Sequence, residues 1–225
     1  MTESKPVVFW DRTRAVKDDD CQRARLWSTE WDGQGVEPLG SAFELDFGII
    51  FHGAMADVVR GDYATVVAQK AGVAMTAKMD PSTPSQRLTE VATLMEGLIL
   101  GFFTSSVWQE MASEYKVIAV EVETTYEWEM DGYTLKLAAK PDLILERLVD
   151  GTKWYFEWKT TGTIDAQWFK QWPRAVQLMA GAVAVKHTLG YELEGCIVQA
   201  LYKGYFSKEQ ERWYSPLVYG YRNGL

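Results

Sequence analysis

The segment AAKPDLILERLVDGTKWYFEWKTTG, residues 138–162, predicts two antiparallel strands joined by a tight turn. Asp150 and Gly151 form a dipeptide that is favoured in two-residue hairpin turns. Apolar and aromatic residues dominate on both sides of this dipeptide, as they do in strands that pack into a core. We therefore expect this hairpin to lie at the centre of the fold.

The second strand of the hairpin carries polar groups on one face and rings on the other. Alternate side chains of a strand share a face, so Tyr155, Glu157 and Lys159 point to one side. The opposite side carries three large rings, those of Trp154, Phe156 and Trp158. Because such rings are rarely left in water along one strand, we expect the aromatic face in the core and the charged face toward a cleft or solvent.

Asp142, in the first strand of the hairpin, is expected beside Glu157. Two neighbouring carboxylates repel each other unless a cation lies between them. Carboxylate oxygens and waters are the ligands that Mg²⁺ takes. The simpler interpretation is an exposed hairpin face with an ordinary Glu157–Lys159 ion pair, which would contribute little to stability.

Composition limits the class of protein. The 225 residues are 47% hydrophobic and 24% charged, which indicates a globular chain with a sizeable core. No apolar run reaches the length of a membrane span and the N-terminus lacks a signal-peptide pattern, so we expect a soluble, cytoplasmic protein without membrane contact.

The net charge of −8 excludes a protein that coats nucleic acid by its overall charge, so any DNA contact must be local. Arginines gather around Cys21, but acidic residues lie among them and a solvated helical surface is the simpler interpretation. Cys21 and Cys196 are isolated in the sequence, and we expect both to be free thiols.

The hydrophobic periods predict a mixed α/β order along the chain. Helices are expected at 43–67, 85–115 and 174–189, and further strands at 117–128 and 195–206. We expect a single domain over 1–225, with a mainly helical N-terminal part (1–115) and a catalytic sheet and helix core (116–225).

The spacing of the hairpin charges matches a known pattern. Pro141 and Asp142 are followed by fourteen residues and then by Glu157, a tryptophan and Lys159. This resembles the PD-(D/E)XK nuclease superfamily. The segment order CQRARLW, FGIIFHGAMADVV, VIAVEVE, KPDLIL, EWKTTG and WPRAVQLMAGAVAV is similar to the RecB-like branch, which includes phage and CRISPR-associated exonucleases. The resemblance implies a restriction-endonuclease-like core, a central mixed sheet flanked by helices.

The resemblance also implies a metal site. His52 matches the histidine that this branch adds to the site from an N-terminal helix, although a lone histidine on an apolar helix is more often a packed core residue. His52, Asp142, Glu157 and the carbonyl of Trp158 would hold one or two Mg²⁺ or Mn²⁺ ions. Lys159 would orient the attacking water or neutralise the phosphate. Glu121 matches an additional acidic position, and it is equally readable as part of a solvated strand face.

The helix expected at 174–189 matches a further motif in part. Gln177 occupies the place of a family glutamine, and Gly181 stands where a tyrosine is usual. Arg174, Gln177 and Gly181 are expected on one helix stripe, with Arg174 and Gln177 holding the DNA backbone or the attacking water. Without the resemblance, Gln177 would be an ordinary exposed amide. Relatives with an iron–sulfur cluster use four cysteines, so we expect no cluster here.

The sequence thus predicts a metal-dependent DNA nuclease, in particular an exonuclease of phage-type recombination, replication or repair. Two alternatives stay open: a structure-specific endonuclease of the same fold, and a non-catalytic DNA-end-binding or scaffold module. The expected partner is DNA, and a single-strand-annealing or recombination protein and a second copy of the chain are further candidates.

Overall fold

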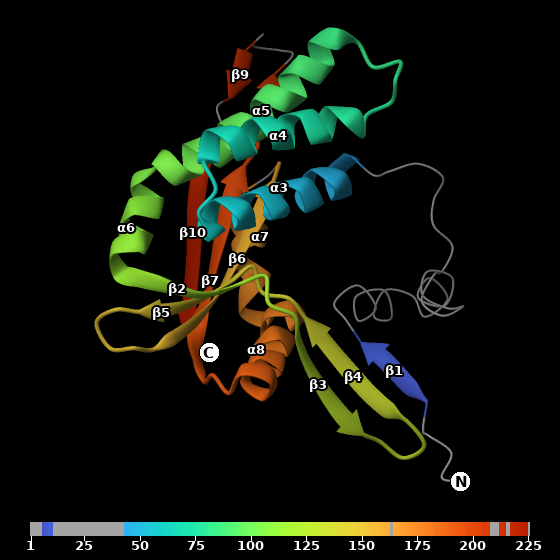
Figure 1. Cartoon of the computed structure of the whole chain (residues 1–225), viewed down its shortest axis with the longest axis vertical. Coiled ribbons are helices and arrows are strands. Elements are labelled where there is room, and N and C mark those ends of the chain that lie inside the picture. Colours follow the sequence, from blue (N-terminus) through green and yellow to red (C-terminus); the bar gives the residue numbers. More distant parts are fainter. Residues whose placement is uncertain (1–5, 11–42, 163, 208–211, 215–216, 225) are drawn as a thin grey trace.

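The computed structural model describes residues 6–10, 43–162, 164–207, 212–214 and 217–224. The arginines around Cys21 lie outside these ranges. Figure 1 shows a central sheet with helices on both sides and a smaller sheet that projects from it. This confirms the predicted α/β class, a mixed sheet flanked by helices.

The central sheet has five strands in the order β10-β7-β6-β5-β2. The predicted hairpin forms its middle, as β5 (Leu143–Arg147) and β6 (Lys153–Thr161), but residues 148–152 connect the two strands in place of the expected two-residue turn. The two strands pair antiparallel, with Leu143 opposite Phe156. β6 pairs in parallel with β7 (Leu193–Tyr202), while β2 (Tyr115–Val120) and β10 (Leu217–Gly224) add antiparallel edges.

Four helices cover one face of this sheet: α3 (Phe43–Arg60), α4 (Ala64–Ala77), α5 (Ser85–Thr104) and α6 (Ser106–Glu114). The helix expected at 43–67 is two helices, because Gly61 adopts a left-handed φ of 115° that ends α3. The helix expected at 85–115 is also divided. It bends by 47° at Ser105, whose extended backbone starts α6 and whose hydroxyl accepts a hydrogen bond from the N–H of Trp108.

Among the described residues no single helix is long and apolar enough to cross a membrane, although the bent pair α5 and α6 meets that test together by length and composition.

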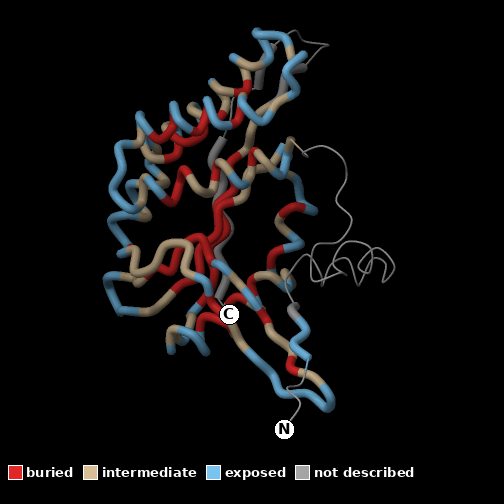
Figure 2. The backbone as a smooth tube through the Cα atoms, turned by 45° about the vertical axis from the view of Figure 1, so that its right-hand side comes forward, coloured by how far each residue is buried: buried red, intermediate tan, exposed pale blue. Residues whose placement is uncertain are grey.

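The opposite face of the sheet is covered as well. α7 (Ala166–Lys170), a 3₁₀ turn at Trp172–Arg174 and α8 (Val176–Leu189) pack there against Ile144, Tyr155 and Val198. In Figure 2 the buried part of the chain runs through the centre between these two coverings. The aromatic face of β6 is in the core, as predicted. The expectation that the charged face opens to a cleft or solvent is wrong for Glu157, which is only 2% exposed, whereas Lys159 on the same face is partly exposed.

The strand predicted at 117–128 is broken at Glu121, which has a positive φ of 48°. The chain turns there from β2 into β3 (Thr124–Glu129), which belongs to a second sheet. β3, β4 (Thr134–Ala139) and β1 (Val7–Trp10) form this three-stranded sheet, which projects beside α8 in Figure 1. The last predicted strand, 195–206, is also two strands: β7 ends at Tyr202, and β8 (Tyr205–Ser207) follows and pairs with β9 (Arg212–Tyr214).

Candidate functional site

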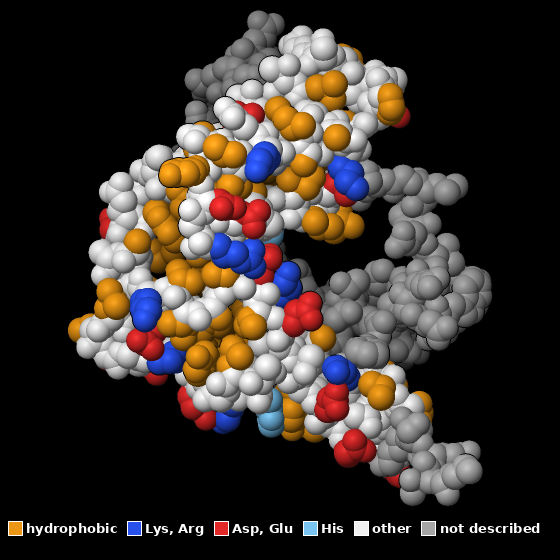
Figure 3. Space-filling view, in the orientation of Figure 1, with side chains coloured by type: hydrophobic (Ala, Val, Ile, Leu, Met, Phe, Trp, Pro, Cys, Tyr) orange, Lys and Arg blue, Asp and Glu red, His pale blue; other side chains and the backbone are white. Residues whose placement is uncertain are grey.

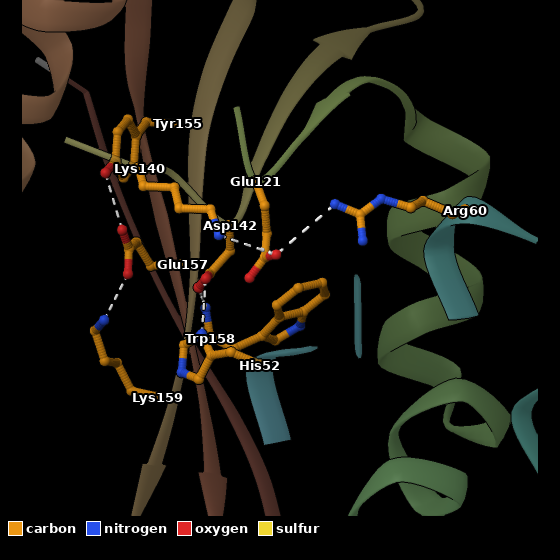
Figure 4. A network of polar contacts seen from close by, with 9 residues as sticks. All are labelled: His52, Arg60, Glu121, Lys140, Asp142, Tyr155, Glu157, Trp158 and Lys159. Carbon is orange, nitrogen blue, oxygen red and sulfur yellow. Dashed lines mark hydrogen bonds and ion pairs between the residues drawn. The ribbon is translucent and has the colours of Figure 1, made fainter. Parts of the chain in front are cut away.

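Asp142 lies at the entrance to β5 and is buried, and both of its carboxylate oxygens have partners. Oδ1 accepts a hydrogen bond of 2.7 Å from Nδ1 of His52, and Oδ2 accepts one of 2.7 Å from the backbone N–H of Trp158 (Figure 4). A neutral imidazole that donates from Nδ1 keeps the lone pair of Nε2 available for a ligand. His52 comes from α3, which packs against β2 and β6, so helix packing brings it to the hairpin from 90 residues away.

Glu157 lies on β6, one strand across from Asp142. Continuing the register of Leu143 with Phe156 by one residue places the two carboxylate residues opposite each other. Oε1 of Glu157 accepts a hydrogen bond of 2.9 Å from the hydroxyl of Tyr155, and Nζ of Lys159 lies 2.5 Å from Oε2.

Burial controls the protonation of this group. The pKa of Glu157 is raised chiefly because burial disfavours its charge, and the charge of Asp142 raises it further against the lowering effect of Lys159. Burial, followed by the charge of Glu157, also raises the pKa of the Tyr155 hydroxyl far above its ordinary value. Tyr155 is therefore a hydrogen-bond donor to a carboxylate that has been taken out of water.

The predicted metal-ligand set is assembled in part. His52 and Asp142 are in contact, and the peptide N–H of Trp158 binds Asp142, but both Glu157 oxygens are occupied by Tyr155 and Lys159. Within the ranges that the structure describes, no three His, Cys, Asp or Glu side chains form a group that could hold a metal ion. The donors nevertheless fit a divalent cation in kind: an imidazole and two carboxylates meet at one end of a hairpin, and the two carboxylates destabilise each other when both are charged.

Glu121 lies next to this group, and its side chain faces cations. Its N–H donates to the carbonyl of Asp142 at 2.9 Å, which ties the bend between β2 and β3 to the hairpin. Oε2 of Glu121 lies 3.2 Å from Nζ of Lys140 and 3.7 Å from Nη2 of Arg60 (Figure 4). A positive φ at a residue other than glycine is uncommon and often marks a constrained site.

The motif expected on the helix at 174–189 is present in a different arrangement. α8 begins at Val176, so Arg174 lies in the preceding 3₁₀ turn and the expected stripe of Arg174, Gln177 and Gly181 on one helix is wrong. Gln177 is in the first turn of α8, and its buried Oε1 has no hydrogen-bond partner among the residues that the structure describes. Gly181, one turn further on, packs directly against the ring of Tyr155.

Three residues that the sequence did not assign to the site lie in it or at its rim. Tyr155 could have been found from its position two residues before Glu157, on the same face of the strand. Arg60 lies two turns after His52 on α3, and Lys140 directly precedes the Pro141–Asp142 pair. Nothing in a single sequence indicates that Arg60 and Lys140 meet at Glu121.

A family model described as the PD-(D/E)XK nuclease superfamily matches residues 24–215. No curated protein matches. Among solved structures, one titled "Crystal structure of SSO0001" is 11% identical, and the match covers 79% of this chain and 76% of that one. Its TM-score is 0.26, too low to support a structural conclusion.

Proposed function

Because this chain belongs to the PD-(D/E)XK nuclease superfamily, we propose that it hydrolyses phosphodiester bonds of DNA in a reaction that requires Mg²⁺ or Mn²⁺. The observation that carries this proposal is the buried pair of Asp142 and Glu157 on adjacent strands, with Lys159 bound to Glu157. Placing two carboxylates and a lysine together at one end of the sheet lowers the stability of the fold, because each buried charge loses its hydration. A role in stability therefore does not explain why these residues lie together.

His52, Asp142, Glu157 and the carbonyl of Trp158 are the residues that would hold the cation. When bound, the metal would lower the pKa of a coordinated water and neutralise charge on the phosphate. His52 is kept in one orientation by its hydrogen bond to Asp142. Lys159, 18% exposed, forms an ion pair with Glu157 and would orient the water or neutralise the phosphate.

The DNA backbone would be bound by local cations around the site. Arg60 and Lys140 are about half exposed and lie on either side of Glu121, and Gln177 and Arg174 remain candidates from the helix side. Figure 3 shows Lys and Arg side chains next to Asp and Glu across the middle of one face of the molecule. Such an interleaved surface agrees with a net charge of −8 and with contacts confined to a few phosphates.

The finer assignment is an exonuclease of the RecB-like branch, acting as a single domain in phage-type DNA recombination, replication or repair. The order of segments from His52 to the helix of Gln177 supports it. A single-strand-annealing or recombination protein and a second copy of the chain are proposed partners. The alternative of an endonuclease with the same site differs in one respect, because it would cut DNA that has no ends.

The test uses end-labelled linear DNA and covalently closed circular DNA, each with Mg²⁺, Mn²⁺ or EDTA. We expect cleavage of the linear substrate with either metal, none with EDTA, and none by Asp142→Asn. Asp131→Asn, an exposed change in the turn after β3, is the matched control and should cleave normally. Cleavage of the circle would replace the exonuclease assignment with an endonuclease. Binding of DNA ends without any cleavage would favour the non-catalytic module, and near-normal activity of Asp142→Asn would overturn the site.

A further inference from the structure

The ring of Tyr155 occupies a specific place between the sheet and α8. Tyr155 is 1% exposed, and it points from β6 toward the helix that covers this face. Its hydroxyl donates to Oε1 of Glu157 at 2.9 Å.

The ring of Tyr155 packs against Gly181 of α8. A Cβ atom placed on Gly181 would lie 2.6 Å from Cε2, 2.7 Å from the hydroxyl oxygen and 2.8 Å from Cζ of Tyr155. These distances are shorter than real Cβ contacts, so any larger residue at position 181 must displace the ring. The ring is itself enclosed by the core around Ile144, Leu178 and Val198, which limits how far it can move.

The two oxygens of Glu157 therefore have different partners. Oε2 is bound by Lys159, a flexible and partly exposed side chain, whereas Oε1 is bound by a rigid and buried phenol. A carboxylate held at one oxygen cannot rotate freely about its last bond. Only Oε2 can then exchange its partner without breaking a contact inside the core.

We propose that Tyr155 is a positioning residue that fixes the carboxylate of Glu157 for metal binding, and that Gly181 provides the space its ring requires. This inference rests on the proposed function, because Glu157 is one of the residues that would hold the metal.

Tyr155→Phe removes the hydroxyl and keeps the ring on Gly181. Loss of a hydrogen bond that orients a metal ligand typically costs about 10–100-fold in metal affinity or activity. We expect the Mn²⁺ concentration for half-maximal cleavage to rise by about tenfold, and the dissociation constant for Mn²⁺ in calorimetry to rise with it. The melting temperature of the metal-free protein should change little, and Tyr63→Phe, on a residue that is 83% exposed, is the control.

Gly181→Ala tests the same contact from the helix, with the hydroxyl still present. The displaced ring should weaken Mn²⁺ binding as Tyr155→Phe does, while Gly101→Ala, which has open space around it on α5, should not. If both changes act through one hydrogen bond, the double variant Tyr155→Phe/Gly181→Ala should bind Mn²⁺ about as weakly as the worse single variant. Should Gly181→Ala fail to fold, Tyr155→Phe alone decides the question.

Normal Mn²⁺ affinity and normal metal dependence in Tyr155→Phe would overturn the positioning role and leave the proposed function standing, provided that wild type cleaves and Asp142→Asn does not. A lowered melting temperature with unchanged Mn²⁺ affinity would also overturn it, since that result describes a packing residue. If wild type neither binds Mn²⁺ nor cleaves, the proposed function fails and the inference falls with it.

Discussion

Glu157 carries an unfavourable electrostatic balance in the metal-free protein. It is 2% exposed, burial and Asp142 raise its pKa, and the opposing contributions of Lys159 and Tyr155 are smaller in sum. A carboxyl group whose pKa is raised on folding stabilises the fold most below its unfolded value, near 4.5, and loses that contribution as pH rises through the folded value. The site is therefore least stable without metal at neutral and alkaline pH.

Glu157→Gln should remove the electrostatic cost of this buried charge. We expect the metal-free variant to melt at or above the wild-type temperature at pH 8, by about 2–4 °C for each kcal/mol of relief, and the gain should shrink toward pH 4. Cleavage should be lost, because the variant lacks one metal-binding carboxylate. Thermal melts in EDTA across this pH range measure the effect. A variant that melts well below wild type at pH 8 would mean that the Lys159 contact outweighs the burial cost.

Substitutions of Lys159 and of His52 should differ in their effects on metal affinity. Lys159→Ala is expected to lose cleavage and keep Mn²⁺ affinity, because an ammonium group opposes the binding of a cation. His52→Ala removes a ligand and the partner of Asp142, so its Mn²⁺ affinity should fall and its residual activity should depend more on Mn²⁺ than on Mg²⁺. Calorimetry with Mn²⁺ distinguishes the two, and weaker binding by Lys159→Ala would contradict the role given to that lysine.

At the scale of elements, the turn between β5 and β6 fixes the register of the site. Gly151 adopts a left-handed φ of 72°, and Asp150 binds the Arg147 guanidinium and accepts from the backbone N–H and the hydroxyl of Thr152 at 3.1 and 2.7 Å. A shift of one residue in this hairpin would move Glu157 to the opposite face. The turn therefore controls the alignment of the two carboxylates at its other end.

The Arg147 hydrogen bond, followed by those from Thr152, lowers the pKa of Asp150. A carboxyl group whose pKa is lowered stabilises the fold above its unfolded value of 3.8 and loses that contribution as pH falls through the folded value. Asp150→Asn should accordingly lower the melting temperature at pH 7, with a difference that narrows as the pH approaches 2. Asp131→Asn, in the turn between β3 and β4, is the control. An equal difference at both pH values would show that the charge of Asp150 contributes nothing.

At the scale of the whole molecule, the net charge of −8 opposes the approach of DNA. Binding must then depend on a few local cations, and affinity should be modest and strongly dependent on salt. A domain of this size that neutralises a handful of phosphates gives a log–log slope of magnitude roughly 3 to 6. Ca²⁺ in place of Mg²⁺ would keep the substrate intact during the titration.

The variants Arg60→Ala and Lys140→Ala should each reduce the magnitude of this slope by about one if the residue contacts a phosphate. Arg174→Ala tests the corresponding prediction from the sequence in the same titration. Lys186→Ala, which removes a lysine paired with Glu192 at the far end of α8, should leave the slope unchanged. An unchanged slope in all three test variants would exclude Arg60, Lys140 and Arg174 as phosphate contacts, and the arginines near Cys21 would then be the next candidates.

Local chemistry explains what the sequence by itself determined. The Asp150–Gly151 turn and the alternation along β6 act between neighbouring residues, so they predict the hairpin, the aromatic core face and the placement of Asp142 beside Glu157. The motif spacing also identifies the superfamily that the family comparison bears out. The roles of the individual site residues stay predictions.

Tertiary structure decided what covers the hairpin and what reaches it. Alternation could not show that α8 buries the face of Glu157, because a charged face next to solvent and a charged face under a helix have the same pattern. The break of the strand at Glu121 depends on a backbone bend tied to Asp142, and its cations come from α3 and from the end of β4. The contact of Tyr155 with Gly181 joins a strand to a helix that packs on it later in the chain. Such contacts join residues far apart in the sequence, and only the packing of α3 and α8 on the two faces of the sheet brings them together.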